Sequence, residues 1–208
     1  VRARALVAAG LVPPPDADAT RALFDRLAEA APEAGVALYS LGDPGLLAAA
    51  TEELVRVVDH WMPLAGARAI DFGCGIGRLT AAMTARGATV TGIDIAPAMI
   101  AEARRRAPGL DFRVGDVEVL TAWPDAGMDL IVAADSMPYL VACDTADRLV
   151  VAAARLLRPG GALILFNWSY RGDPERDAGE IEALAARHGF IVARAGETPF
   201  DIWDARGW

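Results

Sequence analysis

From about residue 68 onward, the sequence alternates between short apolar runs and longer amphipathic stretches. Short apolar runs bounded by turn residues are typical of buried strands, and apolar residues at helical spacing predict helices. Strands that alternate with helices are expected to be parallel, because the chain crosses back over the sheet through each helix. This order constrains the fold more than any other feature and predicts an α/β protein.

The expected strands cover residues 69–72, 89–93, 110–114, 128–133, 162–167 and 190–193. Helices are expected over residues 77–86, 97–106, 144–157 and 175–188. The predicted fold is Rossmann-like and doubly wound, with a mostly parallel sheet and helices on both faces. In such sheets ligands bind beyond the carboxyl ends of the strands, where the strand order reverses.

The N-terminal part of the chain has a less regular pattern. Three prolines at positions 13–15 interrupt any helix that begins before them. Helices are expected over residues 16–29, with Asp18 or Thr20 as the N-cap, and over residues 45–62. We expect residues 1–64 to form a helical cap or lid on a Rossmann-like core of residues 65–208, within a single domain.

Composition excludes several classes of protein. Hydrophobic residues make up 54% of the chain, but no apolar run approaches the ~20 residues of a spanning helix, so no membrane partner is expected. The net charge of −8 disfavours a nucleic-acid partner. The chain contains no lysine, which excludes the usual Walker-type loop, Schiff-base enzyme and Tyr-x-x-x-Lys dehydrogenase. Two cysteines predict neither disulfides nor a metal site, and a cytoplasmic location is the simplest expectation.

The segment Asp71-Phe72-Gly73-Cys74-Gly75-Ile76-Gly77 lies between a predicted strand and a predicted helix. Glycines at alternate positions let the backbone turn sharply and let a ligand approach it without interference from a Cβ atom. We call residues 73–77 the glycine bend. A tight turn without a ligand is the alternative reading of this pattern.

Two further aspartates follow the next two predicted strands. Asp94 comes 23 residues after Asp71, where a carboxylate can accept hydrogen bonds from both hydroxyls of a ribose. Asp116, after the third strand, can accept from an adenine amino group, with a following backbone N–H donating to the ring. Each aspartate alone could be a helix N-cap or a turn residue. Together they predict one crevice lined by carboxylates.

These motifs resemble those of the class I S-adenosylmethionine-dependent methyltransferases, and in particular those of the members that methylate small molecules. The first motif of that family is an acidic residue followed by Gly-x-Gly-x-Gly, as at residues 71–77. The form Asp-x-x-x-x-Met-Ile at residues 94–100, and Leu-Leu-Arg-Pro-Gly-Gly at residues 156–161, are also typical of it. The resemblance covers about residues 65–193.

The resemblance implies that S-adenosylmethionine is the cofactor and S-adenosylhomocysteine the product. It implies methionine contacts at the glycine bend, ribose contacts at Asp94 and adenine contacts at Asp116. A lid over the cofactor is common in the family, and Tyr39 is a candidate for it. The full set of expected cofactor residues is Asp71, Gly73, Cys74, Gly75, Gly77, Asp94, Ile95, Met99, Asp116, Val117, Ala133 and Tyr39.

The end of the fourth expected strand is where the family places the transferring methyl group and its acceptor. Asp135 is the best candidate there for a proton acceptor or for orienting an acceptor amine or hydroxyl. Tyr139 is the second catalytic candidate, although it could equally pack as a structural residue. Residues 167–170, after the fifth expected strand, could line the same pocket or be an ordinary polar strand end.

The expected function is methyl transfer to a small-molecule oxygen or nitrogen acceptor by in-line displacement. A non-catalytic S-adenosylmethionine-binding module would share every glycine and aspartate of the motif. A transferase of the cofactor's aminopropyl group is a further alternative. A dehydrogenase is less favoured, because the chain lacks the Gly-x-Gly-x-x-Gly dinucleotide fingerprint.

Overall fold

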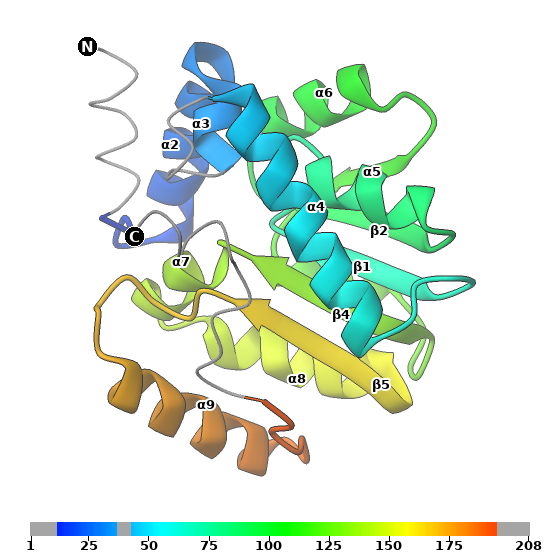
Figure 1. Cartoon of the computed structure of the whole chain (residues 1–208). Coiled ribbons are helices and arrows are strands. Elements are labelled where there is room, and N and C mark those ends of the chain that lie inside the picture. The colour runs from blue at the N-terminus through cyan, green and yellow to red at the C-terminus, as the bar shows by residue number, and fades with distance from the viewer. Residues whose placement is uncertain (1–11, 37–42, 195–208) are drawn as a thin grey trace.

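The computed structural model describes residues 12–36 and 43–194, which form a parallel sheet covered by helices (Figure 1). The five strands are β1 (Arg68–Phe72), β2 (Thr89–Asp94), β3 (Asp111–Val114), β4 (Met128–Ala134) and β5 (Leu157–Phe166). Their order in the sheet is β3-β2-β1-β4-β5, and every pair is parallel. The strand order reverses between β1 and β4, so their carboxyl ends define the expected ligand crevice.

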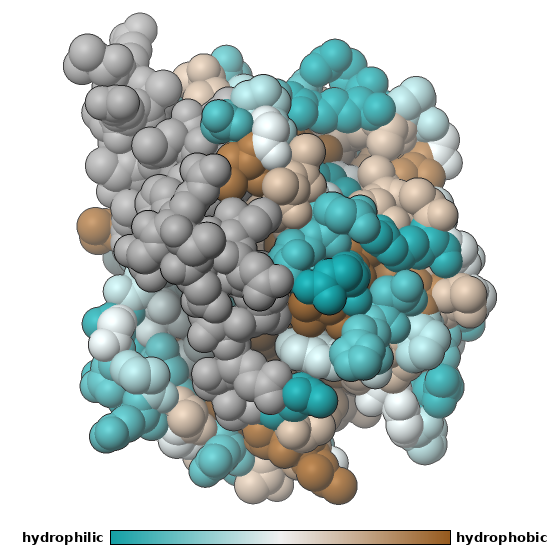
Figure 2. Space-filling model, viewed as in Figure 1, coloured by the Kyte–Doolittle hydropathy of each residue, from teal (hydrophilic) through white to brown (hydrophobic). Residues whose placement is uncertain are grey.

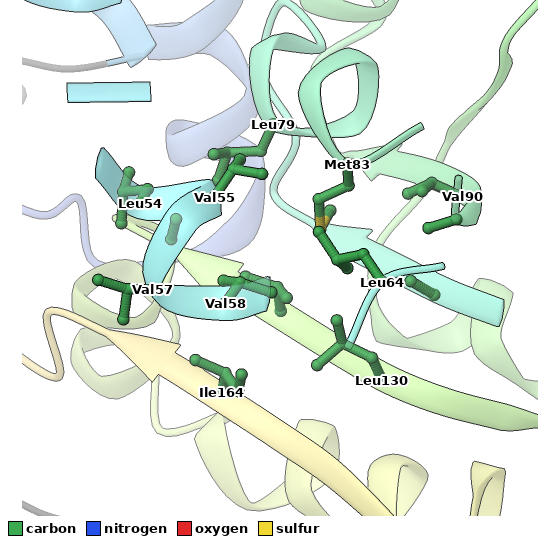
Figure 3. Packing of buried hydrophobic residues seen from close by; sticks show 14 of the residues in the cluster. Leu54, Val55, Val57, Val58, Leu64, Leu79, Met83, Val90, Leu130 and Ile164 are labelled. Carbon is green, nitrogen blue, oxygen red and sulfur yellow. The ribbon is translucent and has the colours of Figure 1, made fainter. Parts of the chain in front are cut away.

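One face of the sheet is covered by helices α4 (Pro44–Trp61), α5 (Arg78–Ala85) and α6 (Pro97–Arg106). Leu54 and Val58 of α4 and Met83 of α5 are almost completely buried, in a cluster that includes Leu130 of β4 (Figure 3). Apolar side chains from alternate strand positions supply the other side of this cluster, as the two-residue period of a strand requires. This packing fixes α5, and with it the glycine bend that precedes α5.

The opposite face is covered by the short 3₁₀ helix η2 (Val117–Ala122) and by α8 (Ala146–Leu156). Helix α7 (Met137–Ala142) follows β4, and α9 (Pro174–Arg187) follows β5 and contacts α8. Helices on both faces of a fully parallel sheet confirm the predicted Rossmann-like, doubly wound fold. The structure assigns helices α3 and α7 and the 3₁₀ helix η2, none of which the sequence pattern predicted.

Helices α2 (Ala17–Ala30) and α3 (Pro32–Val36) lie beside α6, above the carboxyl ends of the strands (Figure 1). Leu23 and Leu27 of α2 are buried against Met99 of α6. Asp25 also accepts a hydrogen bond from the backbone N–H of Ala98, at 2.9 Å, which caps the first turn of α6. The contacts to α6 therefore hold the N-terminal helices over the expected ligand crevice.

Three local predictions need correction. Residues 190–193 form no strand: they follow α9 as irregular chain, and Ile191 is 92% exposed, so it gains no burial from a sheet. The N-cap of α2 is Asp16, whose carboxylate accepts from the N–H of Ala19 at 2.8 Å, rather than Asp18 or Thr20. Strand β5 begins at Leu157 and includes the Pro-Gly-Gly segment, so it starts five residues before the expected residue 162.

The face of the molecule shown in Figure 2 is largely hydrophilic where its residues are described, with smaller hydrophobic areas between the polar ones. Within residues 12–36 and 43–194, no helix combines the length and the apolar character needed to cross a bilayer.

Candidate active site

A cavity of about 150 Å³ lies at the carboxyl ends of the strands, beneath α2 and α3. By the same measure a single water needs about 10–15 Å³, so the space fits a ligand of many atoms. Its walls come from the glycine bend, from the ends of β2, β3 and β4, and from α2, α3 and α7. Among the predicted site residues, those that line it are Gly73, Gly75, Asp94, Ile95, Met99, Asp116, Val117, Asp135 and Tyr139.

The glycine bend presents bare backbone to this cavity. Gly73 and Gly75 have φ angles of +77° and +54°, in the left-handed region that favours glycine. A Cβ atom on Gly75 would lie 2.3 Å from Cγ1 of Val36 in α3, and one on Gly73 would lie 2.4 Å from Cβ of Ser136. The bend therefore tolerates no side chain at either position, and its backbone stays accessible to a ligand.

Asp94 connects the end of β2 to the glycine bend. Its carboxylate accepts the backbone N–H of Gly75 at 2.8 Å and the N–H of Ala96 at 2.9 Å. Burial raises the pKa of Asp94 to about 6, although these two hydrogen bonds act in the opposite direction. Each carboxylate oxygen keeps a second lone pair, so Asp94 can still accept hydrogen bonds from two ligand hydroxyls.

This raised pKa predicts a pH-dependent affinity for S-adenosylhomocysteine. The hydroxyls of a bound ribose would need the ionised form of Asp94, and the free chain takes up a proton there as the pH falls through about 6. We therefore expect the dissociation constant to be about tenfold higher at pH 5 than at pH 7, which calorimetry at both values measures. In the Asp94→Asn variant the remaining affinity should no longer follow this profile. A wild-type affinity that is flat across the range would contradict this role for Asp94.

Asp71 lies behind the bend rather than in the cavity. Its side chain is 1% exposed and accepts a hydrogen bond from the hydroxyl of Thr80 at 2.7 Å. Burial raises its pKa to about 6. This hydrogen bond ties the end of β1 to the first turns of α5, so Asp71 stabilises the bend from beneath and makes no contact with the cavity.

Three other predicted cofactor residues also lie outside the cavity wall. A Cβ atom on Gly77 would meet the Phe112 ring at 2.5 Å, so this glycine permits close packing of the bend on β3. Cys74 is buried, and burial raises the pKa of its thiol, which leaves it a poor nucleophile. Ala133 faces the opposite core cluster; β4 runs one residue further than predicted, and Ala134 lines the cavity instead.

Asp116, at the end of β3, also lines the cavity, and its carboxylate accepts the backbone N–H of Glu118 at 2.9 Å. This bond caps η2, so the two interpretations of Asp116, as a helix cap and as a residue that contacts a ligand, are compatible. Ile95 and Met99 supply apolar wall between Asp94 and α6. Tyr39, the predicted lid residue, lies outside the described residues.

Asp135 and Asn167 occupy equivalent places at the ends of the adjacent strands β4 and β5. Both have left-handed backbones, with φ angles of +61° and +60°, and the Asn167 amide donates to the Asp135 carboxylate at 2.6 Å. Non-glycine residues in this conformation are uncommon and concentrate at functional sites. Burial raises the pKa of Asp135, and Arg78, 3.7 Å from its Oδ2, acts against that shift.

Tyr139 is buried in α7, and its ring lies edge-on to those of Phe24 and Tyr170. Burial is the main cause of a strongly raised pKa for its hydroxyl, which therefore stays protonated near neutral pH. Tyr139 consequently offers a neutral hydroxyl and a ring face, not a base. Phe24 was not predicted as a site residue, because its position in α2 is typical of an ordinary amphipathic helix.

Comparison with known proteins agrees with this geometry. Residues 70–165 match the family model described as a methyltransferase domain. A ubiquinone biosynthesis O-methyltransferase from Xanthomonas oryzae pv. oryzae is 40% identical over 108 residues, which is 50% of this chain and 44% of that protein. A trans-aconitate 2-methyltransferase from Methylobacterium nodulans is 41% identical over 152 residues, which is 69% of this chain and 57% of that protein.

Among solved structures, a TehB-like S-adenosylmethionine-dependent methyltransferase from Corynebacterium glutamicum superposes with a TM-score of 0.52 at 26% identity. That match covers 65% of this chain and 71% of the other. The chain spans about half the length of the curated relatives it matches. Residues 70–165 therefore form a domain of the methyltransferase family, and the chain resembles the class I S-adenosylmethionine-dependent methyltransferases, whose cofactor is S-adenosylmethionine.

Proposed function

We propose that this chain transfers the methyl group of S-adenosylmethionine to an oxygen or nitrogen atom of a small molecule. The observation that carries the proposal is one continuous cavity, which runs from the glycine bend and Asp94 to Asp135. The curated relatives support it, since their names give ubiquinone biosynthesis and trans-aconitate as the context of methylation. The net charge of −8 supports a small acceptor over a nucleic acid.

The described residues fit this cofactor. Backbone amides of the glycine bend would hold its methionine part, Asp94 its ribose, and Asp116 with the N–H of Val117 its adenine. The sulfonium supplies an already activated methyl group, so the chain has to align the acceptor with it and exclude water. Alignment of this kind lowers a barrier by ~7–11 kcal/mol. Helices α2 and α3, which lie over the cavity, would keep water out.

In this proposal Asp135 is the side chain that acts on the acceptor. It lines the cavity beside the end of β1 and is held in one orientation by Asn167. Its raised pKa makes it a stronger proton acceptor than an ordinary carboxylate. In this role Asp135 orients the acceptor hydroxyl or amine and takes its proton as the new bond to carbon forms.

The test is incubation of the chain with methyl-labelled S-adenosylmethionine and pools of small hydroxyl and amine compounds. We expect label in a small-molecule product together with an equal amount of S-adenosylhomocysteine. Release of methylthioadenosine would indicate aminopropyl transfer instead. Tight cofactor binding with no turnover on any pool would indicate a binding module, and label found only in nucleic acid or protein would reject the proposal.

A further inference from the structure

Three aromatic side chains line the part of the cavity next to Asp135. Phe24 comes from α2, Tyr139 from α7, and Tyr170 from the segment after β5. The ring centroids of Phe24 and Tyr139 are 5.0 Å apart with an interplanar angle of 77°. Those of Tyr139 and Tyr170 are 6.1 Å apart at 90°. The rings of each pair are nearly perpendicular and do not stack on one another. We call these three side chains the aromatic box.

The position of Tyr139 in this box is fixed. Its side chain is buried, its ring contacts both other rings, and its hydroxyl is hydrogen-bonded to that of Tyr170. The rings are therefore held in place before any ligand arrives. A preformed group of aromatic rings around a cavity is the usual binding site for ammonium groups, because ring faces carry partial negative charge.

The charge on this part of the cavity is also negative. Asp135 lies close enough to Tyr139 for its carboxylate to contribute to the raised pKa of that hydroxyl. The other charged residues of the described wall are Asp94, Asp116 and Arg148, and the guanidinium of Arg148 is paired with Glu118. The carboxylates would repel an anionic acceptor, and the described wall offers it no free cation. A cationic acceptor would instead be attracted by each of these carboxylates.

Arg78 offsets part of the charge of Asp135, but from outside the cavity wall. Its guanidinium is 3.7 Å from Oδ2 of Asp135, longer than a direct hydrogen bond. It also donates to the hydroxyl of Thr51 at 3.1 Å and to the carbonyl oxygen of Val36 at 3.5 Å. Arg78 is therefore hydrogen-bonded to α3 and α4, and the side of Asp135 that lines the cavity stays available to a ligand.

We infer that the acceptor is a positively charged amine, bound by the box of Phe24, Tyr139 and Tyr170 with Asp135 as its counter-ion. This inference rests on the proposed methyl transfer and narrows its acceptor from oxygen or nitrogen to nitrogen. An ammonium group must lose a proton before its nitrogen can attack. Asp135 takes that proton, the nitrogen lone pair forms the bond to the methyl carbon, and the carbon–sulfur bond breaks with its electrons on sulfur. The products are a methylated ammonium group, S-adenosylhomocysteine and one proton.

The experiment uses three probes of nearly the same shape on the chain saturated with S-adenosylhomocysteine. Choline carries a trimethylammonium group, 3,3-dimethylbutan-1-ol is its neutral carbon analogue, and 3,3-dimethylbutanoate is an anion with the same tert-butyl group. We expect choline to bind at least about tenfold more tightly than either other probe, as measured by calorimetry or by chemical-shift titration. Equal binding of choline and the alcohol, or tighter binding of the anion, would overturn the inference.

Two variants locate the effect in the box. Asp135→Asn and Phe24→Leu should each remove most of the preference for choline, while the affinity for S-adenosylhomocysteine changes less than about twofold. Phe190→Leu, which removes an aromatic ring outside the cavity wall, is the matched control and should keep the preference. If both box variants still preferred choline, the inference would be refuted, but the proposed methyl transfer would not be affected. Failure of the wild-type chain to bind S-adenosylhomocysteine would instead reject the proposed function.

Discussion

Gly75→Val is expected to abolish binding of S-adenosylmethionine and S-adenosylhomocysteine while the sheet stays folded. The φ angle of Gly75 is +54°, where a β-branched residue is strained, and its Cβ atom would lie 2.3 Å from Cγ1 of Val36. The new side chain must therefore enter the cavity or displace α3. Either outcome removes the backbone surface on which the cofactor would rest, so we expect at least about a 100-fold loss of affinity by calorimetry.

The control for this variant is Gly66→Val. Gly66 has a φ angle of +77°, but nothing lies within 4 Å of a Cβ atom built there, and it precedes β1 at the other end of the sheet. Both variants carry a backbone penalty of about 1–3 kcal/mol, which lowers thermal stability to a similar extent. Only Gly75→Val should lose the cofactor. Unchanged affinity in a folded Gly75→Val chain would show that the bend is not the cofactor site.

Asp94→Asn is expected to weaken cofactor binding by about 100-fold. Two hydrogen bonds from ribose hydroxyls to a carboxylate contribute about 3 kcal/mol together, and an amide keeps only one acceptor oxygen. Fluorescence or calorimetric titration with S-adenosylhomocysteine measures the change. Asp111→Asn, at the exposed start of β3, is the matched control and should keep wild-type affinity.

The Asp94→Asn chain should remain folded at neutral pH. Burial raises the folded-state pKa of Asp94 to about 6, above its ordinary value of 3.8. A raised carboxyl pKa means that the folded state binds the proton more tightly, so this group favours folding at low pH and loses that contribution as pH rises from about 4 to 6. Replacing the buried charge removes this cost at pH 7 and offsets the weakened hydrogen bond to Gly75 or Ala96. Unfolding at pH 7 would show instead that the charged form stabilises the bend.

The sequence predicted the fold because periodicity and turn residues fix strands and helices locally. The glycine bend, Asp94 and Asp116 could be placed together because parallel strands end at one edge of the sheet. Side-chain direction was harder to predict. Asp71 and Cys74 belong to the same motif as Gly73, yet they point behind the bend, and a one-residue shift in the end of β4 exchanges Ala133 for Ala134.

Contacts made by distant residues could not be read from local pattern. Phe24 reaches the cavity only because α2 docks on α6, and this docking depends on pairs such as Asp25 with Ala98, 73 positions apart. Asp135 and Asn167 are of residue types that adopt the left-handed backbone more often than most, but local pattern did not predict that both would do so at adjacent strand ends. The expected strand at residues 190–193 failed for a related reason: its apolar residues have no neighbouring strand among the described residues.

The side chain of Arg78 joins three parts of the molecule that turnover would need to coordinate. It is the first residue of α5, directly after the glycine bend, and it reaches the Val36 carbonyl, the Thr51 hydroxyl and the Asp135 carboxylate. The Val36 carbonyl belongs to the helix over the cavity, and the Asp135 carboxylate lies in the cavity wall. Through Arg78, the position of α3 is therefore linked to the charge balance around Asp135.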